Sequence, residues 1–172
     1  MKRRALISSA VLFFLFSSAV FSSQVEKQDA EFLSEAVKSG QFLEALGKTA
    51  STLAAGGEVR QFGREVMNDF SKANKSVREL SAERGIAAAA MDESRRSTLE
   101  WFQRLKGAEF DREFMSLMID ELYRNIEAYG KEIRSGSDLQ VKGFAEGRAP
   151  ALENHLKSAR TVFRGIPAPL LK

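Results

Sequence analysis

The stretch EVRQFGREVMNDFSKANKSVREL, residues 58–80, decides the fold. Its apolar residues recur every three or four positions, as they do along one face of an α-helix. They are Val59, Phe62, Val66, Phe70, Ala73, Val77 and Leu80. Charged residues of both signs occupy many of the other positions, which indicates a salt-bridged face toward solvent. A helix with one apolar stripe must bury it against other elements, so the stretch predicts a helical bundle.

Two further long helices are expected on the same grounds. One apolar stripe follows Asp29 and continues to Leu53, and another follows Asp111 and continues to Ile133. Both aspartates are placed to cap the first turn of their helix, because a carboxylate can accept hydrogen bonds from the free N–H groups there.

A last long helix is expected from Asp138 to about Phe163. Pro150 lies inside its pattern, so we expect a kink or a restart at that point. A shorter helix, starting at Asp92 and including Leu105, is expected in the connection between the second and third long helices.

No stretch of any length alternates as a strand would. The sequence therefore predicts an all-α, antiparallel four-helix bundle with one additional short helix between the second and third long helices. The bundle domain is expected over residues 29–163, followed by a C-terminal tail over residues 164–172.

Residues 1–22 have the pattern of a secretory signal peptide. Lys2-Arg3-Arg4 gives a basic start, residues 5–16 are apolar, and small residues follow. We expect export to the periplasm or cell envelope, with cleavage near Ala19 to Ser22. An uncleaved anchor is the alternative, although the apolar run is slightly short for about 30 Å of hydrocarbon. No later stretch is apolar enough to span a membrane, so no transmembrane segment is expected in the mature chain.

Composition excludes several classes of function. The chain has no cysteine, which excludes disulfides and thiol chemistry. Its net charge of +3 is matched by Lys2-Arg3-Arg4 alone, so the mature chain is expected to be neutral and gives no case for nucleic-acid binding. The expected partners are an envelope protein or a second copy of the chain.

Four motifs in order carry a family resemblance: FLEALG at 42–47, VRQFGREVMND at 59–69, FDREF at 110–114 and APALENHL at 149–156. The chain resembles the exported bacterial DUF4142 family, whose members are ferritin-like helical proteins of undefined biochemical function. The resemblance covers roughly residues 29–163, and it implies a ferritin-like form of the predicted bundle.

The resemblance also implies a metal-type constellation in the bundle core. It places ligands at Glu44, Asp69 and His155, and His155 is the only histidine of the chain. Two further histidines of the family pattern fall at Phe70 and Leu122 here. Apolar side chains at those positions would crowd the places where ligands should point.

Two functions remain open from the sequence. A di-iron bundle site uses Glu-x-x-His pairs, and none occurs here. A reduced set of His155, Glu44 and one of Asp69 or Glu121 would hold a divalent metal such as iron weakly, giving a metal-binding or redox protein. Otherwise His155 is a neutral core histidine bonded to Glu44 or to a backbone carbonyl. We then expect a non-enzymatic binding or structural envelope protein with no cofactor.

Overall fold

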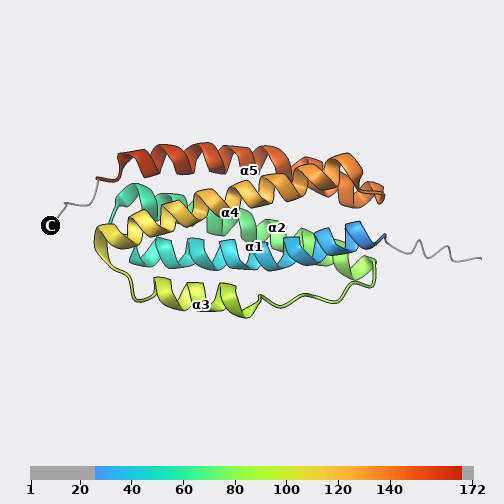
Figure 1. Cartoon of the computed structure of the whole chain (residues 1–172), viewed down its shortest axis with the longest axis horizontal. Helices are drawn as coiled ribbons and strands as arrows, with labels where there is room; N and C mark the ends of the chain where they lie inside the picture. Colours follow the sequence, from blue (N-terminus) through green and yellow to red (C-terminus); the bar gives the residue numbers. More distant parts are fainter. Residues whose placement is uncertain (1–25, 168–172) are drawn as a thin grey trace, which may run out of the picture.

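The computed structural model describes residues 26–167, which form five helices (Figure 1). They are α1 (Lys27–Leu53), α2 (Gly57–Glu83), α3 (Glu93–Phe102), α4 (Gly107–Ser135) and α5 (Leu139–Gly165). The part of the chain described contains no strand, so the predicted all-α class is confirmed. The expected signal peptide lies outside the described residues, and the expected tail is described only to Pro167.

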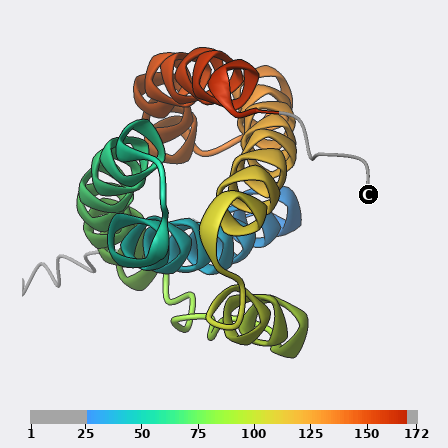
Figure 2. The same cartoon turned by 90° about the vertical axis from the view of Figure 1, so that its left-hand side faces the viewer.

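The four long helices form a bundle in which neighbours run antiparallel (Figure 2). Helix α1 packs against α2 and α4, and α5 packs against the same two helices. The connection from α2 to α4 runs back along the bundle and carries α3, which lies on the outside of α1 (Figure 1). A single long crossover of this kind is the connectivity of ferritin-like bundles. The predicted four-helix bundle and its additional short helix are both confirmed.

The core consists of the apolar stripes seen in the sequence. In α2, every residue of the apolar stripe from Val59 to Leu80 is buried except Leu80 itself, which is partly buried. Facing residues from the other long helices interleave with it, and those with no exposed surface include Leu33, Leu43, Leu46, Phe114, Met118, Leu122 and Leu152. Fully burying such side chains stabilises the fold by roughly 1.5–3 kcal/mol each.

The predicted caps at Asp29 and Asp111 are wrong. Helix α1 begins at Lys27 and α4 begins at Gly107, so both aspartates lie inside their helices. Asp29 is the third residue of α1 and Asp111 is the fifth residue of α4, so each helix begins about one turn or less before the expected cap. Gly107 has a φ of +64°, which helps the chain enter α4 from the crossover.

Each of these aspartates holds the turn of the opposite helix pair instead. The carboxylate of Asp29 accepts the backbone N–H groups of Ser137-Asp138, at 3.0 and 3.2 Å, in the turn between α4 and α5. The carboxylate of Asp111 accepts those of Ala55-Gly56, at 2.9 and 2.6 Å, in the turn between α1 and α2. The two helix pairs are thus locked together reciprocally, one lock at each end of the bundle.

Two features of the helices bear on packing. Helix α5 is continuous through Pro150, so the chain does not restart there. The hydrogen bond lost at proline would use the backbone carbonyl of Glu146, which is an exposed residue. Helices α1 and α2 cross closely at Gly47 and Gly63, where a Cβ on Gly47 would lie 2.7 Å from the Gly63 carbonyl oxygen.

None of the described helices has the length and hydropathy needed to cross a membrane.

Candidate functional site

A part-buried polar cluster between α2 and α5 is built around Asp69. Helix α2 supplies this aspartate, and α5 supplies Arg148 and His155, which lie seven residues apart and so share one helix face. Arg148 donates from Nη1 to Oδ1 at 3.0 Å and from Nη2 to Oδ2 at 2.8 Å. Nε2 of His155 lies 3.0 Å from the same Oδ2 atom. Together these contacts tie α5 to α2.

Burial and hydrogen bonding fix the charge of this cluster. The side chains of Arg148, His155 and Asp69 are 13%, 15% and 28% exposed. Partial burial raises the pKa of Asp69, but hydrogen bonds from His155 and Arg148 and the charge of Arg148 outweigh it. The net result holds the pKa of Asp69 well below its ordinary value of 3.8. Asp69 is therefore an ion-paired carboxylate at physiological pH.

Aromatic rings enclose the cluster. The Phe70 ring stacks on the His155 ring, with centroids 6.2 Å apart and planes 28° apart. Phe62 meets the same imidazole edge-on at 6.3 Å, and the guanidinium carbon of Arg148 lies 5.3 Å from the centre of Phe70. Phe70, at a position where the resemblance implied a histidine, therefore packs against His155.

The cluster reaches a third helix through Tyr129 of α4. The Tyr129 phenol is buried and lies close enough to Arg148 for the guanidinium charge to act on it. Burial raises the pKa of Tyr129 to about 12, although the Arg148 charge opposes that rise. Tyr129 is therefore neutral, and its ring packs edge-on against Phe32 of α1 with centroids 4.9 Å apart.

Glu44 does not join the cluster. Its Oε2 accepts a hydrogen bond from Nδ2 of Asn74 at 2.6 Å, in a groove of α1 and α2 that Lys48 also lines. The partner of His155 is therefore Asp69, and the expected bond from His155 to Glu44 or to a backbone carbonyl is corrected accordingly. Over residues 26–167, no three His, Cys, Asp or Glu side chains gather in a way that could hold a metal ion.

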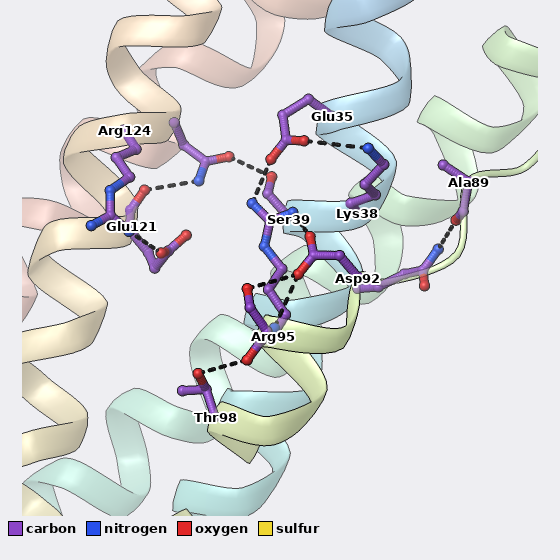
Figure 3. Close-up of polar contacts among 12 residues, drawn as sticks. Glu35, Lys38, Ser39, Ala89, Asp92, Arg95, Thr98, Glu121 and Arg124 are labelled. Carbon is purple, nitrogen blue, oxygen red and sulfur yellow. Dashed lines mark hydrogen bonds and ion pairs between the residues drawn. The ribbon is translucent and has the colours of Figure 1, made fainter. Parts of the chain in front are cut away.

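Glu121 lies elsewhere, on a cavity between α1 and α4 (Figure 3). This buried carboxylate pairs with Arg124 one turn later. Beside it, Ser39 of α1 donates to Asn125 of α4 at 2.9 Å, a buried hydrogen bond that joins the two helices. Leu122 points into the apolar core with no exposed surface. Neither Glu121 nor Leu122 contributes to the Asp69 cluster.

The short helix α3 is fastened to α1 beside this cavity (Figure 3). Arg95 of α3 pairs with Glu35 of α1 and with Asp92, whose carboxylate also caps α3. Gln41 of α1 donates to the carbonyl of Ala89 in the crossover at 3.0 Å. These contacts attach α3 to α1 structurally, since Arg95 is paired with the two carboxylates beside it.

The expected ligand set does not fit a metal ion. Both oxygens of Asp69 are held by the guanidinium of Arg148, whose permanent charge would repel a divalent cation at the same place. Glu44 bonds elsewhere, and Phe70 lines the imidazole. The geometry is that of a hydrogen-bonded ion pair with a histidine attached.

Sequence reasoning missed Arg148. It lies in a segment of α5 with two glycines and Pro150, where the apolar stripe is weak and attracted no interpretation. Its spacing of seven from His155 was the available signal, because that spacing places both side chains on one face.

Comparison with known proteins supports the fold and assigns a family. A crystal structure of a DUF305 fragment from Deinococcus radiodurans is similar, with a TM-score of 0.72 over 82% of this chain and 98% of that one. The two are 11% identical, so the likeness concerns the fold alone. No curated protein matches the sequence. The model of the family described as "Domain of unknown function (DUF4142)" matches residues 16–162, and the chain therefore belongs to the DUF4142 family.

Proposed function

We propose that the protein is a non-enzymatic helical-bundle protein of the cell envelope in which the Asp69 cluster is structural. The observation that carries the proposal is that both carboxylate oxygens of Asp69 already have hydrogen-bond partners. They accept hydrogen bonds from the two terminal nitrogens of Arg148, and Oδ2 is also bonded to His155. A carboxylate engaged in this way is neither a free general base nor a free metal ligand.

The position of the cluster supports a role in holding helices together. Helices α2 and α5 share the least extensive interface among the neighbouring long helices. Arg148 and His155 bridge that interface from α5, and Tyr129 extends the contact to α4. Such a pair adds specificity of packing, because either charge left alone in this place is costly.

If the Asp69 cluster is structural, the protein acts by binding another molecule. The outer faces of the helices are then its functional surface, and its partner is an envelope protein or a second copy of the chain. The charge balance of residues 26–167 favours neither nucleic acid nor a strongly charged surface. Light scattering of the purified chain, together with crosslinking in whole cells, separates self-association from a different partner.

Export is the second part of the proposal. It rests on the basic Lys2-Arg3-Arg4 start, the apolar residues 5–16 and the small residues near Ala19 to Ser22. Cell fractionation and N-terminal sequencing test it. A mature chain beginning between Val20 and Ser23 in the envelope fraction supports export with cleavage, whereas a full-length chain in the cytoplasm contradicts it.

A metal-binding or redox role through His155 is the alternative, since Asp69 and His155 do meet across α2 and α5. It requires Arg148 to leave the carboxylate and further ligands to arrive. Thermal unfolding with excess zinc or manganese, with ferrous iron under anaerobic conditions, and with a chelator separates the two proposals. The structural role predicts one unchanged Tm in all four conditions. A metal that binds the folded state tightly would raise Tm, because such binding stabilises the folded state by several kcal/mol at saturating concentration.

A further inference from the structure

A second buried polar group lies at the end of the bundle where α1 begins and α4 turns into α5. Asp29 of α1 and Glu132 of α4 are each 1% exposed. Their carboxyl groups lie at the same turn, because Oδ1 of Asp29 accepts the N–H of Ser137 and Oε1 of Glu132 packs against Gly136, the preceding residue. Two neighbouring buried carboxylates cannot both be ionised without strong repulsion, so the pair requires one shared proton.

The hydrogen-bond partners of the two carboxyl groups indicate that Glu132 holds that proton. Both oxygens of Asp29 accept backbone N–H groups, from Ser137 at 3.0 Å and Asp138 at 3.2 Å, which suits a carboxylate. Both oxygens of Glu132 are fully buried, and no N–H or O–H donor of the described residues bonds to them. A neutral Glu132 can donate a hydrogen bond from its O–H group to Asp29, which gives one of its two buried oxygens a partner.

The surroundings of the pair oppose ionisation of Glu132. Burial and the neighbouring Asp29 carboxylate raise the pKa of Glu132 from 4.5 to about 7, although Gln28 of α1 and Lys142 of α5 act in the other direction. Arg84, at the end of α2, is held by Asp138 and favours the charge of Asp29. Burial and the Asp29 carboxylate outweigh Gln28 and Lys142, so Glu132 is the carboxyl that holds the shared proton.

Space is also lacking for a hydrated Glu132 anion. Gly136 packs so closely that a Cβ there would lie 2.0 Å from Oε1 of Glu132. Glu132 lines a cavity of about 200 Å³ between α1 and α4, together with Gln28 and Phe32. Both oxygens of Glu132 are buried although the residue lines this cavity, so an ionised Glu132 gains water only through a rearrangement at this end of the bundle.

We propose that Asp29 and Glu132 form a proton-operated latch, closed while they share a proton and released when Glu132 ionises, which frees the start of α1 from the α4–α5 turn. Release leaves the Asp69 cluster in place, because α2 and α5 hold it from the middle of the bundle. It exposes the end of the α1–α4 cavity and the backbone N–H groups that Asp29 had accepted.

The direction with pH follows from linkage. Glu132 has a raised pKa in the closed state, so its stabilising effect is complete below about pH 4.5 and is lost as the pH rises through about 7. From those two values, the opening equilibrium at the start of α1 should increase about thirtyfold between pH 5.5 and 8.5.

Hydrogen exchange tests the latch on the whole mature chain. Exchange rates corrected for intrinsic pH dependence are compared at pH 5.5 and 8.5 for the amides of Leu33, Ser137 and Asp138. The expected result is the thirtyfold increase in opening for the wild type and less than about a threefold change for Glu132→Gln, whose amide stays neutral. Equal pH dependence in the two proteins would overturn the proposal.

A matched control and a direct titration complete the test. Glu121→Gln changes another buried glutamate of α4 that is already paired with Arg124, and it should keep the full pH dependence. Carbon-13 NMR of the Glu132 carboxyl in the wild type needs no variant to fold. A midpoint near pH 7 supports the latch, and a midpoint below about pH 5.5 overturns it.

Discussion

Oδ2 of Asp69 lies 3.0 Å from Nε2 of His155 and accepts Nη2 of Arg148 at 2.8 Å, so one oxygen joins α2 to two residues of α5. The only histidine of the chain is thereby engaged by a carboxylate that a guanidinium already neutralises. This relationship converts a position expected to bind metal into a contact between helices.

Removal of the shared carboxylate should destabilise the bundle strongly. Asp69→Ala leaves the Arg148 charge 13% exposed and without its counter-charge, which costs on the order of 3–5 kcal/mol. Urea denaturation measures the loss. Glu79→Ala, at an exposed position on the same helix, should change stability by less than about 0.5 kcal/mol. Similar effects from the two substitutions would show that the Asp69 contacts contribute nothing.

The same pair should produce a stability loss confined to strong acid. The pKa of Asp69 is lowered in the folded state, so its contribution is present above the unfolded value of about 3.9. It is lost as the pH falls below that value toward the folded pKa. The stability difference between wild type and Asp69→Asn, measured by urea denaturation, should therefore not shrink from pH 7 to 5 and should shrink between pH 4 and 2. A difference that shrinks already between pH 7 and 5 would contradict the assignment.

Close packing of α1 on α2 should make Gly47 intolerant of a side chain. A Cβ there would lie 2.7 Å from the Gly63 carbonyl and 2.8 Å from the Met67 backbone nitrogen, so the helices must separate. Overpacking costs roughly 1–3 kcal/mol and outweighs the helix propensity of about 1 kcal/mol gained with alanine. Gly143→Ala is the control, since nothing lies within 4 Å of its Cβ position in α5. We expect a lower Tm for Gly47→Ala and a higher one for Gly143→Ala, and the reverse order would refute the close approach.

The fold could be predicted from the sequence because burial repeats along each helix. The stripe from Val59 to Leu80 identifies α2 with its buried face, and the same logic finds α1, α4 and α5. The caps could not be predicted in this way. Asp29 and Asp111 look like caps in the linear sequence, yet each satisfies a turn far along the chain, and only the assembled bundle brings them there.

The site was predictable only in part, for a related reason. Asp69 and His155 were identified and do meet, whereas Glu44 turns to Asn74 at the α1–α2 contact. Helical spacing says which face a residue shares, but not which neighbouring helix that face meets. Arg148 and Glu132 were missed because the sequence of a helix does not distinguish a buried charged residue from an exposed one.

The Asp69 cluster is proposed to hold α2 and α5 together and to bind no metal ion. Metal content of the purified mature protein, from cells grown with added iron, manganese and zinc, tests it most directly when wild type and His155→Ala are compared by mass spectrometry. The ion pair of Asp69 with Arg148 predicts a metal content far below one ion per chain in both proteins. A stoichiometric metal in the wild type that is lost in His155→Ala would contradict the account.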